Sequence, residues 1–257
     1  MNRSRRFSLF SCVLFLTVVT TSNALPNLSR IVGGVTAAEG AFPWQVILRS
    51  SGVFFCGGTI VTDRHVVSAA HCFSDTSSKS VNNLAVISGT NSLDNGGQAH
   101  AVAKITKHPK YIGKTDFWKY DVAVLTLRAP IAITPLQSPI PLARRDPPAG
   151  ARAIVSGWGQ TTDSNYNLPS RLQYFTPNII SNTKCESTLR SQVAQVHICA
   201  HENRAGGVCM GDSGGPLVYD GKLVGIVSWG QRPCASLPDA YTRITLVLDF
   251  IEDVIRK

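Results

Sequence analysis

The sequence lacks a second long apolar run. After the stretch from Phe7 to Val19, no later segment has the roughly 20 apolar residues that a membrane-spanning helix needs. Three arginines precede this stretch, and the small residues Ser22-Asn23-Ala24 follow it, as in a secretory signal peptide. We therefore predict a signal peptide over residues 1–24 and a mature chain that is secreted and is not attached to a membrane after the signal peptide is removed. A membrane anchor is the alternative interpretation.

The sequence also lacks any CxxC pair, although it contains seven cysteines. Without such pairs a structural zinc site is disfavoured. Cys12 lies in the predicted signal peptide, so the mature chain keeps an even number of cysteines, as a secreted disulfide protein does. The six are Cys56, Cys72, Cys185, Cys199, Cys209 and Cys234. Six cysteines allow 15 connectivities, and their spacing does not choose among them.

No basic stripe with interleaved aromatic residues is present, which argues against nucleic acid as a partner. The formal net charge is +9, from 25 basic and 16 acidic residues. Removal of residues 1–30 takes away four basic residues and leaves 21 against 16, a net charge of +5. Such a mild excess suits solubility or weak attraction to acidic surfaces. Internal repeats and low-complexity segments are missing as well.

What the chain does contain is a series of short apolar, β-branched runs separated by Gly, Pro, Asn and Asp. This pattern is typical of an antiparallel all-β barrel or sandwich. We expect strands at 45–48, 58–61, 65–69, 122–127, 153–157, 217–218 and 223–228. Residues 134–150 hold five prolines and little periodicity, so they are predicted to link two halves of the chain.

The C-terminal stretch follows a different period. Its apolar residues recur at helical spacing, and two cations come at the end, where the helix dipole is negative. The residues concerned are Val247, Phe250, Ile251, Val254, Ile255, Arg256 and Lys257. We predict a C-terminal amphipathic helix that serves packing only.

Two short strings carry chemistry: AAHC at 69–72 and GDSGGP at 211–216. A serine hydroxyl is a weak nucleophile at neutral pH and needs a base to take its proton, and histidine has a suitable pKa. Glycines around Ser213 allow a sharp turn that can aim the amides of Gly211 and Ser213 at one point, where a developing oxyanion would be stabilised. Either string alone could be an ordinary turn or a core histidine.

Together these strings resemble the trypsin/chymotrypsin family of serine proteases. Further matches, in the family's order, are IVGG (31–34), CGG (56–58), DVAVL (121–125), GWG (157–159) and SWG (228–230). The resemblance covers residues 31–257. It implies a serine protease domain of two six-stranded antiparallel β-barrels, at about 31–140 and 141–257, with the active site in the cleft between them and a C-terminal helix.

The resemblance implies a Ser-His-Asp triad of Ser213, His71 and Asp121, with Gly211 and Ser213 as the oxyanion hole. Asp116 is a nearby rival for the acidic position, but the DVAVL match favours Asp121. A pseudoprotease, a binding module on the same fold, would typically lack a triad residue, and this chain keeps all three.

Activation is also implied by the resemblance. Cleavage after Arg30 would remove residues 25–30 as an activation peptide and free the ammonium of Ile31 to pair with Asp212. A trypsin-like protease would perform that cleavage. A buried ion pair is costly to break from one side, so it can serve as a switch.

The resemblance also implies the disulfides Cys56–Cys72, Cys185–Cys199 and Cys209–Cys234. The loop 90–98 contains only Asp94 as an acidic residue, whereas calcium-binding trypsins place several glutamates there, so we expect no metal and no cofactor. The Asn-x-Ser/Thr sites, at Asn2 and Asn27, lie in the segments predicted to be removed. We expect the mature enzyme to be a monomer that cleaves proteins or peptides and is bound by protein inhibitors.

The substrate pocket departs from the common trypsin pattern. Six residues before the nucleophile stands Gly207, where trypsins have an aspartate that pairs with Lys or Arg. Val208 follows, Met210 is expected over the entrance as an apolar lid, and Gly230 leaves the mouth open. Ser228 and Trp229 complete the predicted substrate-binding set.

Asp239 is the unusual member of this pocket. The resemblance places it on the pocket wall, where a carboxylate must be solvated, hydrogen-bonded or paired. With Gly207 and Val208 it resembles neutrophil elastase-type enzymes, in which Val208 would shield the acid. Gly207 and Asp239 alone also resemble the broad-specificity collagenolytic proteases of crustaceans and some arthropod chymotrypsins, in which the acid stays reachable. We expect an apolar P1 preference. Basic-P1 specificity through Asp239 is the alternative.

Overall fold

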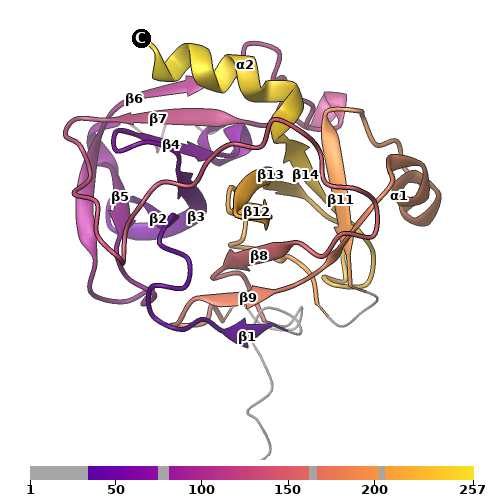
Figure 1. The fold of residues 1–257 in the computed structure, drawn as a ribbon, viewed down its shortest axis with the longest axis horizontal. Coiled ribbons are helices and arrows are strands. Elements are labelled where there is room, and N and C mark those ends of the chain that lie inside the picture. Colours follow the sequence, from indigo (N-terminus) through magenta and orange to yellow (C-terminus); the bar gives the residue numbers. More distant parts are fainter. Residues whose placement is uncertain (1–33, 75–80, 162–166, 203–205) are drawn as a thin grey trace, which may run out of the picture.

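The computed structural model describes residues 34–74, 81–161, 167–202 and 206–257. The predicted signal peptide, the activation peptide, Arg30 and Ile31 lie outside these residues. Within them the chain forms two halves that stand side by side in Figure 1, the first coloured indigo to magenta and the second orange to yellow.

The first half is a closed antiparallel barrel in the order β2-β3-β4-β7-β6-β5. Its strands are β2 (Gln45–Ser50), β3 (Val53–Ile60), β4 (His65–Ser68), β5 (Leu84–Ser88), β6 (Gln98–Lys107) and β7 (Ala123–Leu127). Apolar β-branched side chains from these strands fill the interior, as small barrels require. Closure leaves no unpaired strand edge in this half.

The second half is a sheet in the order β1-β9-β8-β12-β13-β14-β11-β10. Its strands are β1 (Val35–Thr36), β8 (Ile154–Gly157), β9 (Gln173–Phe175), β10 (Asn178–Ile180), β11 (His197–His201), β12 (Pro216–Tyr219), β13 (Lys222–Trp229) and β14 (Asp239–Arg243). The strands β9 and β10 are one stretch of chain interrupted at residues 176–177, because Pro177 has no N–H to donate. Since β9 pairs with β8 and β10 with β11, that stretch connects the two sides of the sheet, which forms a half-barrel, and β1 pairs with β9 at its edge.

Residues 134–150, the predicted linker, contain no helix or strand. Two α-helices accompany the barrels: α1 (Asn182–Leu189), capped by the Ser181 hydroxyl, and α2 (Ile244–Ile255). The helix α2 packs Ile244, Val247 and Ile251 into an apolar cluster that contains residues of both halves, so it bridges the halves (Figure 1). In the parts of the chain described here, no helix is both long and apolar enough to cross a membrane.

The predicted fold class is therefore confirmed, with two features that the sequence did not indicate. One is the division of a barrel strand into β9 and β10. The other is α1, whose apolar pattern is weak, although the Ser181 cap before it was visible in the sequence. Three short 3₁₀ helices, η1 (Ala70–Phe73), η2 (Val81–Asn83) and η3 (Lys114–Asp116), complete the described elements.

Candidate active site

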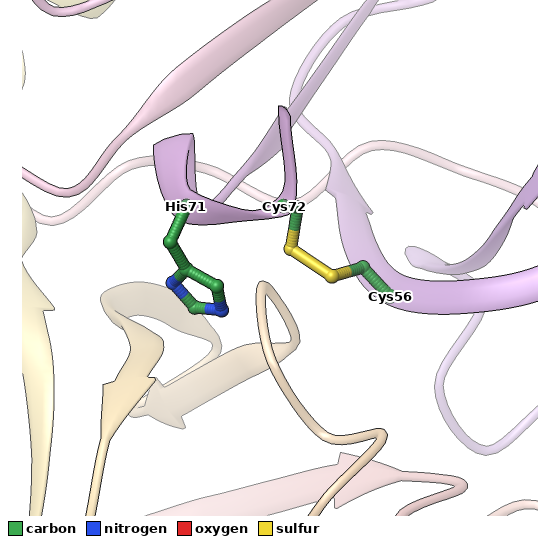
Figure 2. Close-up of side chains that lie close together, drawn as sticks. All are labelled: Cys56, His71 and Cys72. Carbon is green, nitrogen blue, oxygen red and sulfur yellow. A yellow bond between two sulfur atoms is a disulfide. The ribbon is translucent and has the colours of Figure 1, made fainter. Parts of the chain in front are cut away.

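His71 lies in η1, directly after β4 of the first barrel. The Cys56–Cys72 disulfide ties this turn to β3, and Figure 2 shows the bond beside the imidazole. A metal at this cluster would need thiolates, and both sulfurs are committed to the disulfide. The bridge therefore fixes the position of His71.

Asp121 lies two residues before the start of β7 and is fully buried. Its Oδ2 lies 2.7 Å from Nδ1 of His71, and its Oδ1 accepts from the main-chain N–H of His71 at 2.8 Å. The Ser228 hydroxyl donates to the same Oδ2 at 2.6 Å. Since a carboxylate accepts, Nδ1 carries the proton and Nε2 is left as the basic nitrogen. Asp116, the rival acid, instead pairs with Lys119 at 2.6 Å.

Ser213 sits in a tight turn between two glycines with positive φ, Gly211 (105°) and Gly214 (78°). A Cβ on Gly214 would lie 2.1 Å from the Ser68 hydroxyl, so only glycine fits there. The Ser213 carbonyl accepts from Gly57 N–H at 2.8 Å, which joins the turn to the first barrel. The amides of Gly211 and Ser213 donate to no group of the described residues.

A cavity of about 410 Å³ lies over this turn. The predicted residues that line it are His71, Val208, Met210, Gly211, Ser213, Ser228, Trp229 and Gly230. Met210 is 54% exposed, as a lid over the entrance would be. Phe55, Trp118 and Arg232 line the cavity too and were not predicted.

Gly207 and Asp239 do not line this cavity but lie behind its wall. Gly207 packs against Ala235, where a Cβ would meet the main chain at 2.6 Å. Asp239 is buried, and its Oδ2 accepts from the Val208 N–H at 3.0 Å. A Cβ on Gly230 would lie 2.6 Å from the Asp239 carboxylate, so glycine makes room for the acid. Burial raises the pKa of Asp239 to about 8, and the nearby Asp212 adds to this effect.

Asp212 is buried beneath the nucleophile turn. Its carboxylate accepts from the N–H groups of Gly159 at 2.7 Å and Cys209 at 2.9 Å. Burial nevertheless raises its pKa to about 7, because the two hydrogen bonds offset only part of the desolvation. The carboxylate also occupies the space where side chains at Gly157 and Gly159 would begin, which explains the GWG string.

The structure contains the disulfides that the resemblance predicts. Cys185–Cys199 joins α1 to β11, and Cys209–Cys234 joins the segment before the nucleophile to the segment after Trp229. Both Cys209 and Cys234 line the cavity, so this bridge holds two of its walls together.

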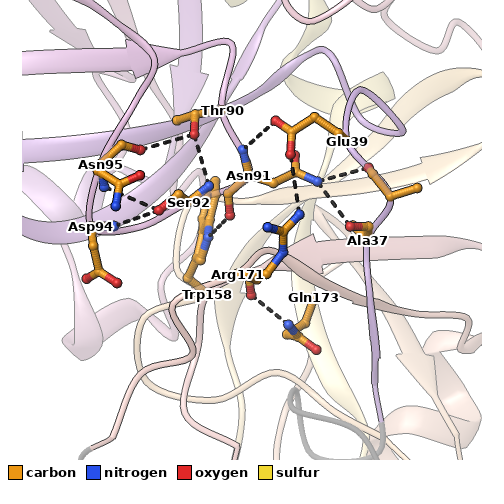
Figure 3. Close-up of polar contacts among 11 residues, drawn as sticks. Ala37, Glu39, Thr90, Asn91, Ser92, Asp94, Asn95, Trp158, Arg171 and Gln173 are labelled. Carbon is orange, nitrogen blue, oxygen red and sulfur yellow. Dashed lines mark hydrogen bonds and ion pairs between the residues drawn. The ribbon is translucent and has the colours of Figure 1, made fainter. Parts of the chain in front are cut away.

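The loop 90–98 is closed by its own polar side chains. The Thr90 hydroxyl donates to the Asn95 carbonyl at 3.2 Å, and Ser92 accepts from the Asp94 N–H at 3.3 Å. Asn91 reaches Ala37, and its carbonyl accepts from the Trp158 indole at 3.1 Å (Figure 3). These contacts fix the loop against the start of the described chain.

Comparison with known proteins agrees with this geometry. The family model described as Trypsin matches residues 31–251. The chain belongs to the trypsin family of serine proteases. It is accordingly a serine endopeptidase, a hydrolase of peptide bonds.

Individual relatives give the same picture. The chain is 39% identical to trypsin delta of Drosophila erecta over 243 residues, which is 92% of each chain. It is 36% identical to anionic trypsin of Bos taurus, over 95% of this chain and 97% of the relative. The solved structure of neuropsin, a serine protease of mouse brain, superposes with a TM-score of 0.80 at 33% identity, covering 86% of this chain and 98% of neuropsin.

Proposed function

We propose that the chain is a secreted endopeptidase, made as a zymogen, that cleaves through an acyl-enzyme with Ser213, His71 and Asp121 as its triad. The observation that carries this proposal is the 2.7 Å contact between His71 Nδ1 and Asp121 Oδ2, with His71 and Ser213 on the same cavity. The signal-peptide pattern of residues 1–24 supports secretion.

In this mechanism the Ser213 hydroxyl attacks the scissile carbonyl while Nε2 of His71 takes its proton. The protonated His71 then gives that proton to the leaving amine, and water repeats the sequence to release the acyl group. The carboxylate of Asp121 stabilises the imidazolium that forms. Three donors hold Asp121 in place, which supports this role.

The oxyanion of each tetrahedral intermediate would be bound by the amides of Gly211 and Ser213. Both amides lie at the cavity and donate to no other group of the described residues, which supports the assignment.

For activation, we propose cleavage after Arg30 and pairing of the new Ile31 ammonium with Asp212. The burial of Asp212 and its raised pKa of about 7 support this proposal, because a cation would supply the charge that two amides leave unbalanced. A trypsin-like protease would be the activator, and protein substrates and protein inhibitors are the partners expected of a trypsin-like protease.

For substrates, we propose an uncharged aliphatic or apolar P1 residue. Val208 forms part of the cavity wall, and Asp239 lies behind it, hydrogen-bonded to the Val208 amide. This arrangement favours the shielded, elastase-like interpretation over direct pairing of Asp239 with a basic P1 residue. The names of the trypsin relatives do not decide this point, because Gly207 stands where trypsins have their pocket aspartate.

The test is a P1 scanning library on enzyme cleaved at Arg30, with Arg30→Gln as the precursor control. We expect the Arg30→Gln chain to stay inactive after trypsin treatment, and the activated enzyme to prefer Val, Leu or Phe. Asp239→Gly should remove any remaining Arg or Lys cleavage and spare apolar cleavage. Activity of the uncleaved precursor would refute the zymogen proposal, faster cleavage after Arg than after Leu would refute the apolar preference, and failure of Ser213 to react with a sulfonyl fluoride would favour a pseudoprotease.

A further inference from the structure

His197, a residue without a part in the triad, is completely buried at the start of β11. Its ring Nε2 lies 3.2 Å from the main-chain carbonyl of Trp118. Because a carbonyl only accepts, Nε2 carries the proton in this contact. The other nitrogen, Nδ1, is buried and has no hydrogen-bond partner among the described residues. The ring thus makes one hydrogen bond, as a donor, from the second half of the chain to the first.

The backbone that receives this hydrogen bond is strained. Phe117, Trp118 and Tyr120 have φ values of 51°, 48° and 56°, in the left-handed region that residues with a side chain rarely adopt. Such conformations persist only where the surroundings fix them. Within the segment, the Trp118 N–H donates to the Gly113 carbonyl at 3.1 Å. The hydrogen bond from His197 comes from a residue 79 positions away and holds the carbonyl of the same residue from the other half of the chain.

The same imidazole also contacts the facing wall of the cavity. Trp118 and Trp229 both line the cavity, and their rings stack with centroids 6.0 Å apart and an interplanar angle of 22°. The His197 ring packs edge-on against Trp229 at 5.8 Å. One buried side chain therefore touches both tryptophans, one through its backbone and the other through its ring.

His197 is itself held firmly. Its carbonyl accepts from Arg243 Nη2 at 2.7 Å and from Asn182 Nδ2 at 3.1 Å. Arg243 is fixed in turn by an ion pair with Asp146 at 2.6 Å. These contacts fix the main chain from which the ring projects, and the ring itself contacts only the Trp118 carbonyl and Trp229 among the interactions described above.

We propose that His197 is a positioning residue that holds Trp118 against Trp229 and so sets how strongly the cleft binds apolar or aromatic substrate side chains beyond P1. Stacked tryptophans offer a rigid apolar surface to such side chains. The inference rests on the proposed function, because it assumes that the cavity beside Ser213 is the substrate cleft.

Burial and the charged groups around His197 determine its pKa. Burial lowers its pKa, and Arg243 and Lys119 lower it further, while the hydrogen bond to Trp118 and the charge of Asp121 act in the opposite direction. A second proton on Nδ1 would be buried without an acceptor among the described residues. The Trp118 contact is therefore made by the neutral ring, with the proton on Nε2.

The test compares His197→Leu and His197→Gln, the second of which retains an N–H donor, with His201→Leu as a matched control on the same strand. The readout is the ratio of kcat/KM for a hexapeptide with apolar residues beside P1 to that for a single-residue ester with the same P1. For His197→Leu we expect this ratio to fall about tenfold through KM, the effect of one buried hydrogen bond, with partial rescue in His197→Gln. An unchanged ratio in His197→Leu would overturn the proposal.

A double-mutant cycle separates positioning from a general effect on folding. In a Trp118→Ala background, His197→Leu should no longer change the ratio, because the ring that it positions is gone. An undiminished effect there would overturn the proposal. If His197→Leu does not fold, His197→Gln carries the test: it should lower the ratio in the wild-type background and not in the Trp118→Ala background. Equal effects in the two backgrounds would contradict the proposal. The rate of Ser213 labelling by a small fluorophosphonate reports the triad separately, so loss of labelling in the wild type would count against the proposed function instead.

Discussion

Two regions around the nucleophile each bury aspartate, and they differ in the number of hydrogen bonds that each carboxylate accepts. At the catalytic corner Asp121 accepts hydrogen bonds from the amide of His71, the imidazole of His71 and the hydroxyl of Ser228. Behind the pocket wall, Asp212 has two amide donors and Asp239 has one among the described residues. Burial raises the pKa of Asp212 to about 7 and of Asp239 to about 8.

The comparison shows that donor number and not depth distinguishes these carboxylates, because all three are nearly inaccessible to solvent. At the catalytic corner, three donors bind the Asp121 carboxylate, and a histidine is one of them. The corner behind the pocket holds acids near their neutral form, so a cation brought to Asp212 would change its charge state. The first arrangement suits steady catalysis, and the second suits a switch.

The largest expected effect comes from breaking the catalytic corner. Ser213→Ala and His71→Ala should each lower kcat by roughly 10⁶-fold, and the double variant should lose little more, because the residues act as a unit. Turnover of a peptide anilide by the activated enzyme measures this. A loss of roughly 10⁶-fold leaves far less than 1% of wild-type kcat. Retention of more than about 1% in either single variant would therefore disprove the triad assignment.

Removing the charge behind the pocket should have the next largest effect. Asp212→Asn keeps the acceptor for the Gly159 amide but cannot balance an ammonium, so cleavage after Arg30 should leave activity about 10²- to 10³-fold below wild type, in line with the cost of an unpaired buried charge. N-terminal sequencing confirms the cleavage, and titration of Ser213 gives the active fraction. Equal activity in the two cleaved proteins would show that no ion pair is needed.

A smaller effect is expected from removing one donor of the catalytic corner. Ser228→Ala deletes the hydroxyl that lies 2.6 Å from Asp121 Oδ2 and should lower kcat about 10- to 100-fold, the penalty of an unsatisfied buried acceptor. Ser228→Thr, which retains a hydroxyl, is the control. Because Ser228 also lines the cavity, kcat and KM are measured separately; a change confined to KM would assign the residue to substrate contact alone.

The short motifs were sufficient to predict the fold and many of the residues that line the cavity, because glycine turns, disulfides and barrel strands leave local signals. The polar partners were harder to predict. Ser228 was expected only to bind substrate, and its hydrogen bond to Asp121 joins residues 107 positions apart. Trp118 and His197 carry no local pattern, since a lone aromatic residue in a loop and a lone histidine in a strand have no spacing from which their contact follows.

The placement of Asp239 was predicted only in part. The sequence put it near the pocket, but whether Val208 covers it depends on the main-chain path between Gly207 and the Cys209–Cys234 disulfide. A side-chain pattern does not encode that path. The shielding of the acid therefore required the structure, and it also determines the last and smallest of the expected effects.

Asp239→Asn should change how stability depends on pH while leaving the fold intact. The pKa of Asp239 is about 8 when folded and 3.8 as the ordinary value, so between these pH values the folded chain binds more protons than the unfolded chain. Stability contributed by the neutral acid is therefore lost as pH rises towards 8, at no more than about 1.4 kcal/mol per pH unit. Asparagine keeps an acceptor for the Val208 amide but does not titrate, so the variant should lose less stability between pH 5 and 8. Urea unfolding in a Ser213→Ala background, which prevents self-digestion, measures the slope, and exposed Asp94→Asn is the control. Identical slopes for Asp239→Asn and its parent would mean that Asp239 is ionised in the folded chain, and the contrast between the two regions would then fail at this residue.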